Sequence, residues 1–378
     1  MNLTYNERKR CCICNNNTFK DILLNDVKIS PSLNLYDTNE TNELIPYNII
    51  ECTKCNSSMI KYLADINIVY GKNHIDAYGS LKSEKHAKFK NFILQNKNIK
   101  TICEIGAATG DLAHTIVNET DIGYKIIEPN YRGKSHNNLK IIKTYFENAD
   151  KDEIKADCLI MSDVFEHFYN PLEALKKILE VGYDYVILNH PDFDYAIENN
   201  HCIILNIEHT FQIEHQLLFN LYNNYGYSLN RRFDFKNFSL FLEFKKENEL
   251  PLLKPIKNLY TSKNIRQYVN NISKISKKMN EYINNNINRE YYIWPCSVHT
   301  TTLFLFGLDY TKFKGILDNS PNKINKYIDG YNLLCGSFNE LIKEENKNIT
   351  IIISGANAYI KELNLNTVVD IKMIEDFI

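Results

Sequence analysis

Four cysteines near the start of the chain have the spacing of a metal site. Cys11 and Cys14 form one Cys-x-x-Cys pair, and Cys52 and Cys55 form a second. In each pair, one tight turn can present two thiolates to the same ion, and two pairs complete a tetrahedral site with four sulfur ligands. Such a site has no open position, so the spacing predicts structural zinc (Zn2+). Free buried thiols are the alternative, and Cys12 leaves open which neighbour would bind the ion.

A glycine-containing turn carries the second chemical signal. The segment EIGAATG follows a strand expected over 100–104 and precedes a helix expected from about residue 111. Glycines at such a junction let the backbone approach a ligand closely, and the carboxyl end of the strand faces the same crevice. The expected cofactor contacts in this turn are Glu104, Gly106, Ala107 and Gly110.

An acidic residue follows about twenty residues later, where a ribose would lie. The next strand, expected over 124–127, ends at Glu128 and Pro129. A carboxylate in this position can accept hydrogen bonds from both ribose hydroxyls. The turn lacks the dinucleotide pattern Gly-x-Gly-x-x-Gly, which favours an adenosyl ligand without phosphates over NAD. The sequence therefore predicts S-adenosylmethionine (SAM) as the cofactor.

Later segments extend the same site. The segment Tyr145-Phe146-Glu147, with Phe146 as its expected cofactor contact, is placed to flank the adenine. A strand expected over 157–161 then leads into Ser162, Asp163, Val164 and His167. Strands that alternate with helices at this spacing describe a doubly wound α/β sheet. His167 is open to two interpretations, an active-site group or a histidine that starts a helix or fills the core.

These segments resemble the successive motifs of class I methyltransferases. The matching stretches are EIGAATGD, IIEPN and SDVFEH, the last followed by Asn170 and Pro171. The resemblance implies that the first turn and Glu128 hold SAM, and that the segment after the fourth strand lines the methyl-donor pocket.

Over nearly its whole length, the chain also resembles the sugar C-methyltransferases that act on nucleotide-linked keto-deoxysugars. The resemblance implies that Glu208 and His209 act at the reacting carbon, where a base removes a proton and the enolate attacks the sulfonium methyl group. A salt-bridged surface pair is the alternative. Tyr78 matches an active-site tyrosine of the family, with a packing role as the alternative. A second family tyrosine is replaced by Asn206, which cannot act as a phenol acid, so methyl transfer to an oxygen stays open.

A second α/β unit is expected near the C-terminus, with strands over 291–294, 314–317 and 348–353. The turns after these strands would meet at one edge of a small sheet. The resemblance implies that His299, Asp318 and Lys323 help to hold the nucleotide diphosphate of the substrate. The segment WPCSVHTTT lacks the glycines usual in the first turn, so a scaffold without a ligand is the alternative.

The expected fold class is α/β, with a Rossmann-like class I methyltransferase core, a small zinc-binding N-terminal lobe and a second Rossmann-like domain. The expected boundaries are 1–70 for the zinc-binding lobe, 71–250 for the SAM-binding domain, 251–287 for a helical connector and 288–378 for the substrate domain. The remaining cysteines lie singly within apolar runs and are expected in the core.

Composition restricts the partners and the compartment. Lysine and arginine (44) nearly balance aspartate and glutamate (46), so neither nucleic acid nor a membrane surface is expected as a partner. The N-terminal segment has no apolar leader, and no run approaches the roughly 18 apolar residues of a membrane span. We therefore expect a cytoplasmic SAM-dependent methyltransferase for a nucleotide-linked sugar. The alternatives are an O-methyltransferase for a sugar or phosphorylated metabolite of surface-polysaccharide synthesis, and a non-catalytic SAM- or nucleotide-binding module.

Overall fold

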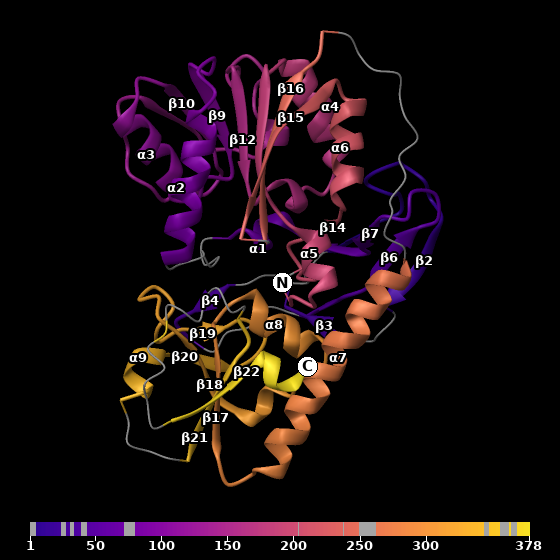
Figure 1. Cartoon of the computed structure of the whole chain (residues 1–378), viewed down its shortest axis with the longest axis vertical. Helices are drawn as coiled ribbons and strands as arrows, with labels where there is room; N and C mark the ends of the chain where they lie inside the picture. Colours follow the sequence, from indigo (N-terminus) through magenta and orange to yellow (C-terminus); the bar gives the residue numbers. More distant parts are fainter. Residues whose placement is uncertain are drawn as a thin grey trace.

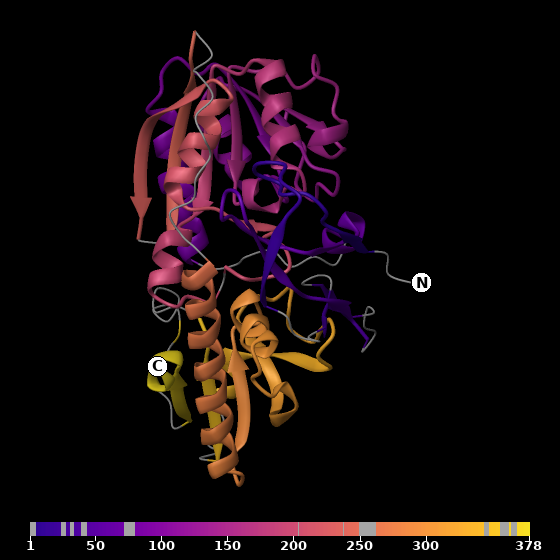
Figure 2. The same cartoon turned by 90° about the vertical axis from the view of Figure 1, so that its right-hand side faces the viewer.

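The computed structural model of the chain describes residues 5–23, 28–30, 34–38, 44–71, 80–202, 204–236, 238–248, 262–343, 348–355, 363 and 369–378. Two α/β units lie at opposite ends of the long axis, and the N-terminal strands lie beside and between them (Figure 1, Figure 2). Among the helices of these described ranges, none is long and apolar enough to cross a membrane.

The first unit is built on a seven-stranded sheet in the order β11-β10-β9-β12-β13-β16-β15. The first five strands are parallel, β16 runs antiparallel to them, and β15, which is antiparallel to β16, again runs in their direction. This is the doubly wound sheet that the sequence predicts. The strands are β9 (Thr101–Ile105), β10 (Gly123–Ile127), β11 (Leu139–Ile142), β12 (Cys158–Ser162), β13 (Tyr185–Pro191), β15 (Tyr227–Phe235) and β16 (Ser239–Lys246).

Helices cover both faces of this sheet because successive strand residues point to opposite sides. Ile102 of β9 packs in the cluster that contains α2 and α3, whereas Cys103 packs in the cluster that contains α4 and α6. Figure 1 shows these two pairs of helices on either side of the strands. The helices of this unit are α2 (Ser80–Leu94), α3 (Asp111–Glu119), α4 (Pro171–Val181), α5 (Phe193–Glu198) and α6 (His215–Asn224).

The second unit contains a sheet in the order β22-β21-β17-β18-β20-β19-β4. Its strands β22, β21, β17, β18 and β20 are parallel, so the expected turns do meet at one edge. The strands from this part of the chain are β17 (Glu290–Trp294), β18 (Phe313–Asp318), β19 (Tyr327–Ile328), β20 (Leu333–Ser337), β21 (Ile349–Ile353) and β22 (Asp370–Met373), and the helices are α7 (Ser262–Asn285), α8 (Val298–Leu305) and α9 (Phe338–Leu341).

The N-terminal lobe consists of short strands and one short helix. They are β1 (Tyr5–Glu7), β2 (Phe19–Leu23), β3 (Lys28–Ile29), β4 (Leu35–Tyr36), β5 (Ile45–Pro46), β6 (Ile49–Cys52), β7 (Ser58–Ile60), β8 (Tyr62–Ala64) and α1 (Ile66–Val69).

The three parts of the chain exchange strands. β4 of the N-terminal lobe pairs with β19 at the edge of the second sheet. In the other direction, β14 (Phe211–Gln212) extends from the first unit and pairs with β7 in a four-stranded sheet of the N-terminal lobe. Backbone hydrogen bonds therefore cross the lobe boundaries expected near residues 70 and 288. α7 lies in the expected connector and contacts β2, α5 and α8.

Candidate functional site

A cavity of about 210 Å3 opens at the carboxyl ends of β9, β10 and β12. Ligands in open α/β sheets bind at this edge, where the strand order reverses. The lining combines the turn after β9, the end of β10, the segment after β12 and the end of the N-terminal lobe. Of the residues expected to bind the cofactor, those in the lining are Gly106, Glu128, Pro129, Phe146, Asp163 and Val164.

The glycine turn forms one wall of this cavity. Gly106 has φ +74°, and a Cβ atom built on it would lie 2.7 Å from Cγ2 of Val164. An L side chain there would be both strained and in collision, so the chain needs glycine at this position. Gly110 also has a positive φ and precedes the first residue of α3, Asp111. The structure thus has the strand–turn–helix order that the sequence predicts here, with Gly106 in the cavity lining.

The Glu128 carboxylate lies beside the same turn. Oε2 accepts a hydrogen bond from the backbone N–H of Ala108 at 3.2 Å, and Oε1 accepts one from the backbone N–H of Asn130 at 2.9 Å. An ionised carboxylate has about four acceptor positions. Glu128 can therefore accept further bonds from a vicinal diol in the cavity.

Four expected cofactor residues lie next to the cavity but outside its lining: Glu104, Ala107, Gly110 and Ser162. Glu104 is 3% exposed and accepts a hydrogen bond from the hydroxyl of Tyr124 at 2.9 Å. Burial raises the pKa of Glu104 to about 7, although the Tyr124 bond acts to lower it. Ser162 Oγ accepts a bond from the Asn189 amide at 2.9 Å. These side chains support the strand ends that surround the cavity.

Asp163 adds a fixed negative charge to the lining. Its Oδ2 accepts from Lys85 Nζ at 2.6 Å and from the Asn189 amide at 3.0 Å. Burial acts to raise the pKa of Asp163, and the Lys85 ammonium acts to lower it. The net result is a pKa below the usual value. The carboxylate is therefore ionised near neutral pH. Its φ of +54° places it in a left-handed backbone conformation directly before Val164.

His167 forms the inner wall of the cavity together with Tyr70. The Tyr70 hydroxyl and His167 Nδ1 are 2.5 Å apart. Tyr70 follows α1 of the N-terminal lobe, and no motif in the sequence marks it. Tyr169 also lines the cavity without having been expected there. The lobe that carries the cysteine pairs thus supplies part of the cavity wall.

Glu166 and His209 lie behind His167. His209 Nε2 is 4.0 Å from Glu166 Oε1, and His167 Nε2 is 3.8 Å from the same oxygen. Burial, and then the neighbouring charge of Asp163, raise the pKa of Glu166 well above its usual value. Burial lowers the pKa of His209 to about 3. The sequence pointed to His167 and His209 but not to Glu166.

Glu208 and His209 belong to a tight turn that Asn206 stabilises. Asn206 Oδ1 accepts the backbone N–H of Glu208 at 2.8 Å and that of His209 at 3.1 Å. All three residues are buried. The carbonyl of Asn206 therefore holds the backbone that presents the Glu-His pair. Tyr78, the other tyrosine expected in the active site, lies outside the described residues.

The three expected substrate residues meet at the carboxyl edge of the second sheet. Lys323 Nζ is 2.8 Å from both Asp318 Oδ2 and the carbonyl oxygen of Cys296. Asp318 Oδ1 accepts two backbone N–H groups, from Asn319 and Ser320. His299 is 9% exposed, and burial lowers its pKa to about 3. Asp318 and Lys323 are thus buried and hydrogen-bonded to each other, in a turn that they stabilise.

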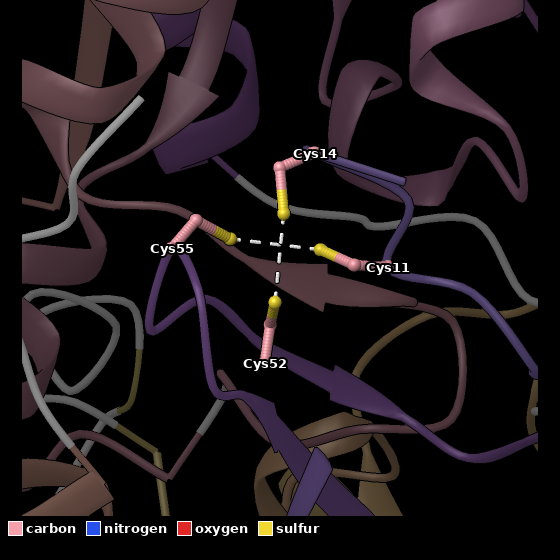
Figure 3. A group of neighbouring side chains, drawn as sticks. All are labelled: Cys11, Cys14, Cys52 and Cys55. Carbon is pink, nitrogen blue, oxygen red and sulfur yellow. Dashed lines mark hydrogen bonds between the residues drawn. The ribbon is translucent and has the colours of Figure 1, made fainter. Parts of the chain in front are cut away.

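The cysteine pairs converge from two turns of the same form (Figure 3). The Sγ atoms of Cys11 and Cys55 are 3.5 Å apart, as are those of Cys14 and Cys52. Sulfurs at about 2.3 Å from a tetrahedral zinc ion lie about 3.8 Å apart, so the observed arrangement fits such an ion with small adjustments. Each pair is followed by an asparagine in the left-handed region, with φ of 60° at Asn15 and at Asn56.

Backbone N–H groups also point at the cysteine sulfurs. The N–H of Ile13 donates to Cys11 Sγ and that of Lys54 donates to Cys52 Sγ, each at 3.4 Å. Such bonds favour thiolates, which are the form that binds a metal. The remaining cysteines, which the sequence predicts in the core, are all buried: Cys103, Cys158, Cys202, Cys296 and Cys335.

A family model described as a methyltransferase domain matches residues 78–191. The chain carries a SAM-dependent methyltransferase domain. The matched segment contains the glycine turn, Glu128, Asp163 and His167. Glu208, His209, the cysteine pairs and the second α/β unit lie outside it.

Solved structures similar to this methyltransferase include the N-methyltransferase NodS from Bradyrhizobium japonicum WM9 in complex with S-adenosyl-L-homocysteine. Its identity is 11% and its TM-score 0.36, with 44% of this chain and 88% of that chain covered. The methyltransferase domain of bacterial CtHen1 is similar at 14% identity and a TM-score of 0.36, with 44% and 100% covered. No curated protein sequence matches the chain.

Proposed function

We propose that this methyltransferase transfers the methyl group of SAM to a nucleotide-linked sugar, by way of an enolate carbon. The observation that carries the proposal is the position of the turn over 206–209. At one end, the rings of His209 and His167 lie 5.2 Å apart, centre to centre, beside the cofactor cavity. At the other end, Asn206 and Ile207 share a small cavity with Thr301 and Thr302 of α8. The turn therefore connects the methyl-donor site to the second α/β unit.

The lining of the first cavity suits the adenosyl part of SAM. SAM supplies an electrophilic methyl group on a sulfonium sulfur. Glu128 accepts the ribose hydroxyls, and Phe146 and Tyr145 lie where they can flank the adenine. Asp163 provides a negative charge in the same wall. Tyr70 and Ile66 of the N-terminal lobe line the cavity and exclude water from it.

The Glu208–His209 pair handles the acceptor proton in this proposal. A carbon beside a ketone loses its proton to a nearby base, and a base held in place contributes about 10²–10⁴-fold to such a step. Both Glu208 and His209 are buried. Burial lowers the pKa of His209 to about 3, so its ring is neutral near pH 7 but is a weak proton acceptor in this buried state.

Methyl transfer to an oxygen is the second candidate, and Asn206 favours it. In the turn, Asn206 accepts two backbone bonds and offers no acidic hydroxyl to a developing enolate. An alcohol acceptor has no such requirement, because the same base removes its hydroxyl proton directly.

We also propose a structural zinc ion at Cys11, Cys14, Cys52 and Cys55. The support is the convergence of the four sulfurs to within 4.8 Å of one another and their paired N–H donors. Elemental analysis of the purified chain should find at least one zinc ion per chain. Protein without zinc would refute this part.

Isotope transfer tests the function. The chain is incubated with methyl-labelled SAM and a panel of nucleotide-linked 4-keto sugars, first in water and then in heavy water. Exchange at the carbon beside the ketone, with methyl incorporation at the same carbon, is the expected result. Incorporation without exchange would favour an oxygen acceptor. SAM binding without incorporation into any nucleotide-linked sugar would contradict the proposal and favour the non-catalytic module.

Glu208→Gln separates the acceptor step from cofactor binding. We expect turnover to fall by about 100-fold or more, with SAM affinity within about twofold of the parent chain. Glu180→Gln is the matched control, because Glu180 lies in a surface ion pair with Lys151. Unchanged turnover in Glu208→Gln would remove Glu208 from the proposed chemistry.

A further inference from the structure

Glu166 is a carboxylate without the partners that a buried charge requires. Its side chain is 0% exposed, and neither oxygen accepts a hydrogen bond from any described residue. Within the described part of the chain, its ion-pairing partners are the imidazoles of His167 and His209. An isolated buried carboxylate costs several kcal/mol. Such a group therefore indicates a ligand that brings positive charge or hydrogen-bond donors.

The two imidazoles present the same nitrogen to this carboxylate. Nε2 of His167 and Nε2 of His209 lie 3.8 and 4.0 Å from Glu166 Oε1. One ligand atom of each residue lies within 4.8 Å of the others. Ligands at about 2.1 Å from a tetrahedral ion are about 3.4 Å apart, so each of these two distances needs to shorten by about half an ångström.

The second nitrogen of His167 is already fixed. Its Nδ1 lies 2.5 Å from the hydroxyl of Tyr70. Histidines that bind metals usually donate their other ring N–H to an oxygen, which directs the lone pair of the remaining nitrogen at the ion. With Nδ1–H donating to Tyr70, the lone pair on Nε2 of His167 faces Glu166.

We propose that Glu166, His167 and His209 bind a divalent transition-metal cation at the inner wall of the methyl-donor cavity. Two imidazoles and one carboxylate are typical of zinc and non-haem iron sites that keep open positions. His167 lines the cavity, so an ion bound at its Nε2 would lie next to the cavity wall. The ligand class for those positions is an oxygen of the acceptor, either a carbonyl or a hydroxyl.

A cation at this site would change the roles of His209 and Glu208 in the proposed reaction. It polarises the bound acceptor oxygen, which makes the neighbouring proton easier to remove. With His209 as a ligand, the other member of the pair, Glu208, accepts that proton. The electron pair of the broken C–H or O–H bond then forms the bond to the methyl group, and the sulfonium C–S bond breaks to leave a neutral thioether. The site itself does not depend on which acceptor is bound.

Cobalt titration of the chain loaded with one equivalent of zinc, enough to fill the four-cysteine site, tests the second site without any acceptor. Co2+ is the probe, because a nitrogen and oxygen site gives visible ligand-field bands without the thiolate charge-transfer bands of the cysteine site. We expect one equivalent to bind with the nitrogen and oxygen spectrum. Glu166→Gln and His209→Gln should each weaken binding by at least about 100-fold, and Tyr70→Phe by about tenfold. His136→Gln changes a half-buried histidine outside the cluster and should leave the Co2+ affinity unchanged.

Two results would overturn the proposal. The first is that the zinc-loaded parent chain binds no Co2+ outside the cysteine site, which would mean that water alone meets the Glu166 carboxylate. The second is parent-like affinity in both ligand variants. If circular dichroism shows that a variant does not fold, a cobalt-soaked crystal of the parent chain decides whether Co2+ binds at these three side chains. Anomalous density at about 2.1 Å from the three side chains supports the site, and density only elsewhere refutes it. Because binding alone is measured, failure of the sugar assignment leaves this result intact.

Discussion

Replacing Glu104 with glutamine should make the chain more stable at alkaline pH. Glu104 is buried, and its one hydrogen bond in the described structure comes from Tyr124. Its pKa of about 7 in the folded chain compares with 4.5 for the unperturbed group. The folded state therefore binds this proton more tightly than the unfolded state does. As pH rises from 4.5 to 7, the folded chain loses free energy of unfolding, and above pH 7 the loss stays constant.

The size of the effect follows from the two pKa values. One pKa unit corresponds to about 1.36 kcal/mol. The loss is about 1.4 kcal/mol at pH 5.5 and about 3.3 kcal/mol at pH 8. Glutamine at position 104 cannot ionise, and its carbonyl oxygen can still accept from Tyr124. The difference in free energy of unfolding between Glu104→Gln and the parent should therefore grow by about 2 kcal/mol between about pH 5.5 and pH 8.

Urea unfolding followed by circular dichroism at the two pH values measures this difference. Glu243 on β16 is the matched control, because it is also buried but pairs with Arg231. Burial acts to raise its pKa, yet the bonds from Arg231, Asn230 and Asn96 hold it below the usual value. That carboxylate stabilises the fold at neutral pH and loses this contribution as pH falls through its lowered pKa. Glu243→Gln should thus destabilise at pH 8, by about 2 kcal/mol. A pH-independent effect of Glu104→Gln would refute the reasoning.

Two further perturbations test the cofactor turn and the cysteine site. Gly106→Ala should weaken SAM binding by about tenfold or more, because a left-handed backbone costs an alanine about 1–2 kcal/mol and the new Cβ collides with Val164. Calorimetric titration with SAM measures the affinity. An affinity equal to that of the parent chain would contradict the need for glycine at this position. Cys14→Ser should lower the zinc content and the thermal unfolding temperature together, whereas Cys202→Ser, at a buried cysteine outside the cluster, should leave the zinc content unchanged.

The sequence predicts the elements around the glycine turn well because their signals are local. A strand, a turn with glycines and a helix follow one another, and Glu128 comes at the end of the next strand. The structure confirms the elements β9, α3 and β10 at these positions. The need for glycine at position 106 comes from this short segment and from Val164, which belongs to the SDVFEH motif.

Other parts of the site depend on contacts that no local pattern encodes. Tyr70 reaches His167 across 97 positions in sequence, and it does so because the N-terminal lobe packs over the cavity. Glu166 lies inside the SDVFEH motif, yet its isolation is a property of the side chains around it. The exchanged strands β4 and β14 contain two residues each, which is too short for a periodic signal.

The strand exchange also links the cysteine cluster to the turn over 206–209. Cys52 and Cys55 fix the end of the β6–β7 hairpin, and β7 pairs with β14 through Met59 and Phe211. Directly before β14, the N–H of Thr210 donates to the carbonyl oxygen of Glu166 at 3.0 Å, and its hydroxyl donates to Phe168 at 2.6 Å. An ion at the cysteines would therefore restrain His209 relative to the 166–168 segment through two hydrogen-bonded steps. The N-terminal lobe therefore does more than stabilise the fold, because it holds together the two segments, 166–168 and 206–209, that meet beside the cavity at the ends of β9, β10 and β12.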